Sequence, residues 1–222
     1  DSTLQYNLQH SMGDYLGAIV VMERDTGRVL AMVSNPGYNP NLFEPVNFNS
    51  MMLESVLNDP KLPLYNRATQ GVYPLGSVFK IITMAAALET GVFTPDYPYY
   101  CASTWTELQG VTLYDWTYDR DLPASGELTL QEGLMRSCNP WFWHIGYTLW
   151  NEGYTTAIAD VASGFGLGKK TGIEIQEFEG RLEQPTSVSE NVQLAIGQGT
   201  LQVSPLQVAS FVAAVGNGGT LY

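Results

Sequence analysis

The sequence predicts an α+β fold, and the prediction rests on three observations. Two apolar, β-rich runs in residues 17–34 flank a short turn, which is the pattern of a hairpin. Later stretches carry apolar residues at helical spacing. Strand-like and helix-like segments do not alternate regularly along the chain, so a parallel sheet built from βαβ units is not expected.

The N-terminal part is expected to hold a short helix and the hairpin. Residues 1–14 can form the helix. In the hairpin, Asp25-Thr26-Gly27 is the expected turn, and Gly27 supplies a positive φ there. Both apolar runs are almost continuous, which indicates that helices or other layers cover both faces of this sheet. Residues 35–73 are expected to form a long surface excursion.

The helices are expected after this excursion. One follows Gly76 and ends at Gly91, because its apolar positions have helical spacing. Residues 97–126 show no strong period. Residues 128–135 predict a second helix, and the aromatic residues after Pro140 suit a buried one. Residues 204–219 predict a last helix that starts at Ser204-Pro205 and closes at a glycine.

Composition excludes several classes of function. The chain has 222 residues and a formal charge of −12, which makes nucleic acid or an anionic membrane surface an improbable partner. Two histidines and two cysteines without metal-ligand spacing predict no metal site and no cofactor. No apolar run is long enough to span a bilayer, so any membrane anchor or export signal is expected outside these residues. A disulfide between Cys101 and Cys138 is possible, but their spacing does not decide it.

The first candidate for chemistry is the pair Ser77 and Lys80. On a helix, positions i and i+3 lie on one face, so the Lys80 amine can reach the Ser77 hydroxyl. A neutral amine can take the proton of an attacking serine, and burial or nearby positive charge keeps a lysine neutral. By itself Ser-x-x-Lys is a weak signal, and a capping serine beside a solvated lysine is the alternative.

The second candidate is Ser137-Cys138-Asn139. In acyl transfer, a serine here can relay a proton to a leaving amine, and the asparagine amide can bind the backbone of a substrate. The same spacing recurs at Ser189 and Asn191, and a helix cap or turn is the alternative reading of either copy.

Taken in order, these segments resemble the transpeptidase domain of the penicillin-binding proteins, of the monofunctional class B type. The resemblance covers essentially the whole chain, with "GAIVVMERDTGRVLAMVSNPGYNPN" similar to the family's first hairpin and "NRATQGVYPLGSVFKIITMAAALETG" to its nucleophile segment. "LMRSCNPWFWHIG" is similar to the second motif, which favours Ser137 and Asn139 over Ser189 and Asn191. Leu75 stands where proline is usual.

The resemblance implies a β-lactamase-like fold, with a five-stranded antiparallel sheet between helices. It implies a D,D-transpeptidase that cross-links peptidoglycan stem peptides ending in D-Ala-D-Ala and that β-lactam antibiotics acylate. Ser77 would be the nucleophile, Lys80 its base, Ser137 the proton relay and Asn139 a substrate-binding residue. The protein would act outside the cytoplasm, anchored by a membrane segment beyond this chain, beside a membrane glycosyltransferase.

Lys170-Thr171-Gly172 repeats the family's third motif but is interpreted as a coincidental match. The family's motif is followed by Thr or Ser, whereas Ile173 follows here and offers no hydroxyl. We therefore expect residues 1–222 to be the N-terminal and central part of one transpeptidase domain, with the third motif and the C-terminal strands beyond Tyr222 and the sheet incomplete. A β-lactam sensor or non-catalytic cell-wall scaffold remains the alternative, and a serine β-lactamase is a less favoured one.

Overall fold

The computed structural model describes residues 1–47 and 49–222, which divide into two units built from interleaved parts of the chain. The first unit comprises Asp1–Tyr73, Phe165–Gly180 and Val203–Tyr222. The second unit comprises Pro74–Gly164 and Arg181–Gln202. Both candidate segments, around Ser77 and around Ser137, belong to the second unit.

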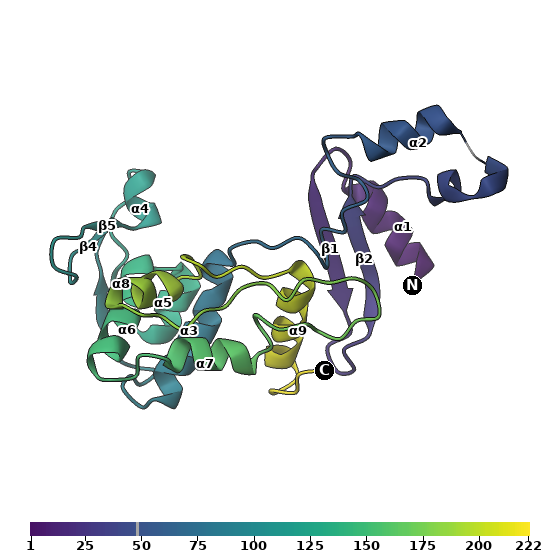
Figure 1. Cartoon of the computed structure of the whole chain (residues 1–222). Helices are drawn as coiled ribbons and strands as arrows, with labels where there is room; N and C mark the ends of the chain where they lie inside the picture. Colours follow the sequence, from purple (N-terminus) through teal and green to yellow (C-terminus); the bar gives the residue numbers. More distant parts are fainter. Residues whose placement is uncertain (48) are drawn as a thin grey trace. The chain divides into compact units, whose positions relative to one another are not determined.

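The first unit contains the predicted helix and hairpin. α1 (Ser2–Ser11) precedes β1 (Gly17–Met22) and β2 (Val29–Asn35), which pair antiparallel. Gly27 has a φ of 69°, so the predicted turn residue is confirmed. α1 packs against β2, and α9 (Pro205–Gly216) packs against β1 (Figure 1). Helices therefore pack against both strands of the hairpin, but every residue of β1 is only half-buried.

The sheet of the first unit is small. Among the described residues, β1 and β2 pair only with each other, whereas the family resemblance implies five strands. The excursion after β2 is largely exposed, as predicted, but it contains a helix that the sequence analysis did not anticipate. Its elements are η1 (Pro40–Phe43), η2 (Pro45–Asn47) and α2 (Ser50–Leu57).

The second unit is a cluster of helices. α3 (Lys80–Glu89) follows a 3₁₀ turn, η3 (Gly76–Phe79). It packs against α5 (Leu130–Arg136), α6 (Asn139–Asn151) and α7 (Ala157–Gly164) (Figure 1). α6 is the buried aromatic helix that the sequence predicts, with Trp141 and Phe142 fully buried. The cluster also contains α8 (Val188–Leu194).

Short strands lie in the stretch without a strong sequence period. β3 (Tyr99–Cys101) pairs with β6 (Gly126–Leu128), and β4 (Thr104–Trp105) pairs with β5 (Leu113–Tyr114). The one-turn helix α4 (Trp116–Asp119) follows β5. Helices and small antiparallel strand pairs together make an α+β architecture, which confirms the predicted fold class.

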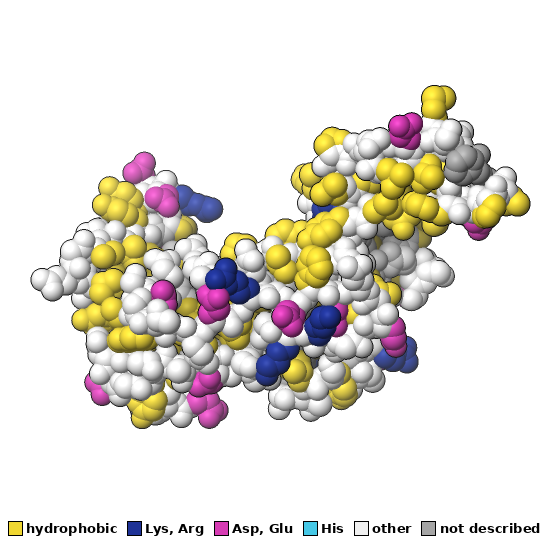
Figure 2. Space-filling view, viewed as in Figure 1, with side chains coloured by type: hydrophobic (Ala, Val, Ile, Leu, Met, Phe, Trp, Pro, Cys, Tyr) yellow, Lys and Arg dark blue, Asp and Glu magenta, His cyan; other side chains and the backbone are white. Residues whose placement is uncertain are grey.

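Charged side chains of both signs lie on the face drawn in Figure 2. Figure 2 shows the Lys and Arg side chains of the described residues scattered among Asp and Glu on the face that is drawn. This distribution agrees with the net charge of −12. Every helix in residues 1–47 and 49–222 is too short or too polar to cross a bilayer.

Candidate active site

Ser77 and Lys80 lie one turn apart where the 3₁₀ turn η3 runs into α3. The Lys80 backbone N–H donates to the Ser77 carbonyl oxygen, which closes this turn. Side chains at i and i+3 of a 3₁₀ turn lie on the same side. Ser77 is exposed, whereas the Lys80 side chain is fully buried. The turn therefore places an exposed serine three residues before a buried lysine.

The segment around Gly197 supports this turn from the side. The Gly76 N–H donates to the Gly197 carbonyl oxygen at 2.9 Å, and Thr83 Oγ1 donates to the Ala195 oxygen at 2.8 Å. A Cβ on Gly197 would lie 2.3 Å from the Gly76 oxygen, and Gly197 has a φ of +71°. Only glycine satisfies both the contact and the conformation, so "AIGQG" is a structural support of the turn that carries Ser77.

Leu75 keeps a backbone conformation that proline also allows. It is the residue before η3 and has a φ of −74°, within the range to which the proline ring is restricted. The φ of Leu75 is therefore one that a proline at this position would also adopt.

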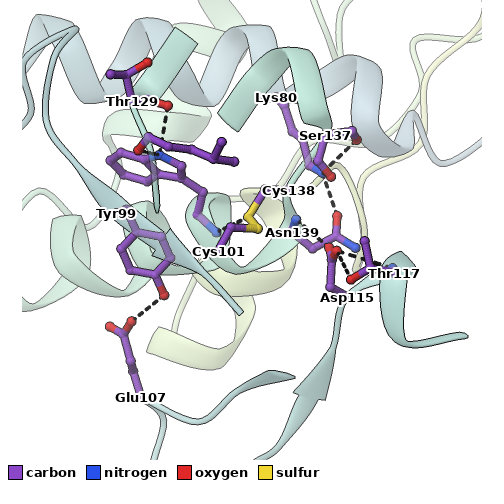
Figure 3. The surroundings of a disulfide bond; sticks show 12 residues. Lys80, Tyr99, Cys101, Glu107, Asp115, Thr117, Thr129, Ser137, Cys138 and Asn139 are labelled. Atoms are coloured by element: carbon purple, nitrogen blue, oxygen red, sulfur yellow. Dashed lines mark hydrogen bonds between the residues drawn. A yellow bond between two sulfur atoms is a disulfide. The ribbon is translucent and has the colours of Figure 1, made fainter. Parts of the chain in front are cut away.

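Lys80 joins the two candidate segments. Its Nζ donates to Ser137 Oγ at 3.1 Å, to the Ser137 carbonyl oxygen at 2.8 Å and to Asn139 Oδ1 at 2.6 Å (Figure 3). The Phe142 ring closes another side, with its centroid 5.3 Å from Nζ. Three acceptors match the three N–H groups of an ammonium. When the amine is neutral it keeps two of them, and its lone pair can accept a proton.

Burial sets the acid–base character of Lys80. It disfavours the ammonium and lowers the pKa of Lys80 from 10.5 to about 8, while the negative charge of Asp115 acts in the opposite direction. A base that titrates near neutral pH can take a proton from a hydroxyl and return it to a leaving amine. Lys80 is therefore buried, as expected from the sequence, and its burial favours the neutral amine that a base requires.

Ser137-Cys138-Asn139 is the junction between two helices. Ser137 ends α5 in the left-handed conformation, with φ of 53° and ψ of 38°, and Cys138 caps α6. This conformation is uncommon for a residue with a side chain, and such residues cluster at functional sites. Ser137 and Cys138 are helix-capping residues, as the alternative reading expects. The same junction also directs Ser137 and Asn139 toward Lys80 (Figure 3).

A disulfide fixes this junction from its other side. Cys101 on β3 is bonded to Cys138, and their Cα atoms are 6.3 Å apart (Figure 3). Both cysteines are fully buried. The disulfide that the sequence left open is therefore formed, and it ties the residue between Ser137 and Asn139 to a strand 37 residues earlier.

Asp115 is a residue of the site that sequence reasoning missed. Its side chain is fully buried and accepts a hydrogen bond from the Asn139 backbone N–H at 2.9 Å. It also accepts from the Thr117 hydroxyl at 2.8 Å and caps α4 (Figure 3). In the sequence Asp-x-Thr indicates only a local cap, and the contact with Asn139 spans 24 residues.

The second copy of the Ser-x-Asn pattern has a structural role. Ser189 and Asn191 lie in α8, and Asn191 is fully buried. Its Nδ2 donates to the Gly146 carbonyl oxygen at 2.7 Å, which joins α8 to α6. A Cβ on Gly146 would lie 2.9 Å from the Asn191 oxygen, so the two helices meet closely there.

Lys170-Thr171-Gly172 lies in a loop, and its donors are engaged by a neighbouring carboxylate. Glu177 is buried and accepts from the Thr171 N–H at 3.0 Å, the Thr171 hydroxyl at 2.8 Å and the Gly172 N–H at 2.9 Å. The hydrogen bonds to Glu177 therefore use the Thr171 and Gly172 donors of this loop. The geometry therefore favours a coincidental match, as the sequence indicates.

The residues that the structure describes hold no group of three or more His, Cys, Asp or Glu side chains arranged to bind a metal ion. The two cysteines are joined in the disulfide, so their thiolates are not available as ligands. The functional groups brought together in the second unit are instead a hydroxyl, an amine and an amide.

The sequence matches a known family over most of its length. Residues 17–222 match the family model described as the penicillin binding protein transpeptidase domain. The chain is 31% identical, over 231 residues, to the peptidoglycan D,D-transpeptidase MrdA of Haemophilus influenzae. That match covers 99% of this chain and 34% of the relative, so the chain spans about a third of the length of that curated protein.

Solved structures of similar proteins agree with this match. Pseudomonas aeruginosa PBP2, in complex with WCK 5153, has a TM-score of 0.88 and 30% identity, covering 99% of this chain and 49% of that one. Penicillin-binding protein A of Mycobacterium tuberculosis, in a penicillin G acyl-enzyme complex, has a TM-score of 0.83 and 30% identity, covering 99% of this chain and 51% of that one.

Proposed function

We propose, since the chain belongs to the penicillin-binding protein transpeptidase family, that the protein is a serine-type D,D-transpeptidase that cross-links peptidoglycan stem peptides and is acylated by β-lactams. The observation that carries the proposal is the network of Lys80. A fully buried lysine, one turn after an exposed serine, donates to both Ser137 and Asn139. This is the set of groups that acyl transfer through a serine requires.

The first half of the proposed reaction forms an acyl-enzyme. Ser77 Oγ attacks the carbonyl carbon of the penultimate D-Ala, and its proton passes to the neutral Nζ of Lys80. The negative charge on the carbonyl oxygen is stabilised by backbone N–H groups, of which that of Ser77 lies in the first turn of a helix. The bond to the terminal D-Ala nitrogen then breaks.

The leaving nitrogen needs a proton, and Ser137 is placed to relay it. Its hydroxyl is 3.1 Å from Lys80 Nζ, so it can donate its own proton to the departing amine and recover one from the ammonium. In the second half, an amine of a neighbouring strand attacks the acyl carbon, the bond to Ser77 breaks, and the proton of the amine returns along the same path.

Asn139 is proposed to hold the substrate backbone. Its Oδ1 accepts from Lys80, which leaves the Nδ2 group to donate to a substrate carbonyl. No residue in the described part of the chain is assigned to binding the terminal carboxylate, because Thr171 and Gly172 already bind Glu177.

The proposed setting follows from the substrate. Peptidoglycan lies outside the cytoplasm, so we propose an extracytoplasmic location with a membrane anchor. A monofunctional transpeptidase does not polymerise glycan strands, so we propose a membrane glycosyltransferase partner that supplies them.

Fluorescent penicillin tests the proposal on the full-length product of the gene that encodes this chain. The protein should carry one covalent label, which peptide mapping assigns to Ser77, and the Ser77→Ala variant should carry none. Ser189→Ala is the matched control and should be labelled normally. If no adduct forms on Ser77, the proposal is wrong.

A second step separates the alternatives. With a stem-peptide mimic, a transpeptidase releases D-Ala and forms an acyl-enzyme that intact mass detects. A β-lactam sensor or scaffold would form no acyl-enzyme from this peptide. A penicillin adduct that decays within seconds would favour a β-lactamase.

A further inference from the structure

We propose that Asp115 is a positioning residue of the acyl-transfer site, where its buried carboxylate holds Asn139 in place and supplies a negative charge beside the network of Lys80. This inference rests on the proposed function of Ser77 and Lys80. Asp115 is not proposed to touch the substrate.

The first argument is the cost of burying Asp115. A carboxylate removed from water is unfavourable unless hydrogen bonds or a cation compensate it. Among the described residues, no Lys, Arg or His lies within ion-pair distance of Asp115. Its hydrogen bonds are donated by the Asn139 N–H, the Thr117 hydroxyl and, at 3.3 Å, the Thr117 N–H. The bonds from Thr117 are those of an ordinary helix cap, whereas the bond from the Asn139 N–H joins Asp115 to a residue 24 positions later that contacts Lys80.

The second argument is the path from Asp115 to Lys80. Asp115 accepts from the backbone of Asn139, whose side chain in turn accepts from Lys80 Nζ at 2.6 Å. A second backbone bond, from the Asp115 N–H to the Ser103 oxygen at 2.9 Å, anchors Asp115 to the strand region. Asp115 and the disulfide of Cys138 therefore hold two successive residues of the junction (Figure 3).

The third argument is electrostatic. Burial lowers the pKa of Lys80, and the charge of Asp115 limits that decrease. The other ionisable side chains of α3 and of the helices packed against it are exposed or half-buried. They are Glu89 on α3, Glu132 and Arg136 on α5, His144 and Tyr147 on α6 and Asp160 on α7. Asp115 is thus the charge that tunes the fraction of neutral Lys80.

Two substitutions separate the charge of Asp115 from its hydrogen bond to Asn139. Asp115→Asn keeps an oxygen that can accept from the Asn139 N–H, but it removes the charge and the acceptor that faces Thr117. Asp115→Ala removes both. Asp119→Asn is the matched control, because it removes an exposed carboxylate from the same short helix.

The experiment measures two quantities on the full-length gene product. One is the rate of acylation by fluorescent penicillin as a function of pH. The other is the pKa of Lys80, followed by NMR of ¹³C-labelled lysine side chains. Lys80→Arg removes the signal of Lys80 and thereby assigns it among those of the other lysines.

Asp115→Asn should lower the pKa of Lys80, and with it the midpoint of the pH–rate profile, by about one unit. Asp115→Ala should show the same shift and also lose at least about tenfold in the limiting rate, because Asn139 is no longer held. Asp119→Asn should change neither quantity.

The inference is overturned if the pKa of Lys80 in Asp115→Asn equals that of the unsubstituted protein. It is also overturned if Asp115→Ala folds and keeps the full limiting rate. If Asp115→Ala does not fold, Asp115→Asn alone decides. If the unsubstituted protein is not acylated at all, the proposed function fails separately, and the NMR titration still tests the effect of Asp115 on Lys80.

Discussion

Two tripeptides of this chain match motifs of the same family, and their polar groups face different partners. In Ser137-Cys138-Asn139, the serine hydroxyl and the asparagine amide meet the amine of Lys80. In Lys170-Thr171-Gly172, the threonine hydroxyl and two backbone N–H groups surround the carboxylate of Glu177. The first segment places groups that can exchange protons beside Lys80, whereas the donors of the second segment are hydrogen-bonded to Glu177.

The comparison shows how a short motif acquires chemical meaning. The residue types of a motif determine which hydrogen-bond donors and acceptors it contains, but the fold determines which groups they bind. The Ser137 hydroxyl lies beside a buried amine and can relay a proton. The Thr171 hydroxyl already donates to the Glu177 carboxylate, so it is not free to donate to the carboxylate of a substrate. Substitutions in the first segment should therefore lower the acylation rate, whereas substitutions in the second should lower the free energy of unfolding.

The largest difference is expected between Ser137→Ala and Thr171→Ala. Removing the Ser137 hydroxyl should slow acylation by penicillin by about 10²–10⁴-fold, the usual contribution of a positioned proton-transfer group. Thr171→Ala should leave the acylation rate unchanged. Both rates are measured with fluorescent penicillin on the full-length gene product. Equal losses in the two variants would contradict the distinction between the segments.

The disulfide provides the next test, because it fixes only one of the two segments. Replacing Cys101 and Cys138 by serine should lower the free energy of unfolding by about 2–4 kcal/mol and slow acylation, since the Ser137 junction loses its tether. Denaturant titration measures the stability. A reductant should reproduce both effects in the unsubstituted protein and should have no effect on the double variant. Unchanged acylation after complete reduction would argue that the tether is only structural.

Local patterns in the sequence predicted a large part of this structure. The hairpin and its Gly27 turn, the helix after Gly76 and the buried aromatic helix depend on neighbours within a few residues, which periodicity and turn chemistry describe. Helix α2 and the helices α7 and α8 were missed, as were the strands of two or three residues in the stretch from 97 to 126, because segments so short show little period.

The parts of the site that sequence could not supply are long-range. The disulfide joins residues 37 positions apart, and Asp115 reaches Asn139 over 24 positions. No local pattern distinguishes Asp115 from other aspartates that cap a turn. The first turn before Lys80 is 3₁₀ rather than α-helical, and it lies against Gly197, which is about 120 positions later in the sequence.

A third prediction concerns the carboxylate that occupies the second segment. Glu177→Gln should lower the free energy of unfolding by about 1–2 kcal/mol, because an amide cannot accept all three hydrogen bonds from Thr171 and Gly172. Glu179→Gln, at an exposed position two residues later, should have little effect and is the matched control. Acylation should be normal in both variants. A Glu177→Gln protein that is as stable as the control but is not acylated would place this loop in the active site.

The smallest effect expected is a pH dependence that belongs to the first segment alone. Burial lowers the pKa of Lys80 to about 8, so below that pH the amine is an ammonium and cannot accept the proton of Ser77. The acylation rate should therefore rise about tenfold between pH 7 and pH 9, following the neutral fraction of Lys80. Glu177→Gln should show the same dependence of the acylation rate on pH, because the Glu177 carboxylate accepts its hydrogen bonds from the second segment. A rate that is flat across this range, or that falls as the pH rises, would mean that neutral Lys80 is not the base, and the relay through Ser137 would then need another proton acceptor.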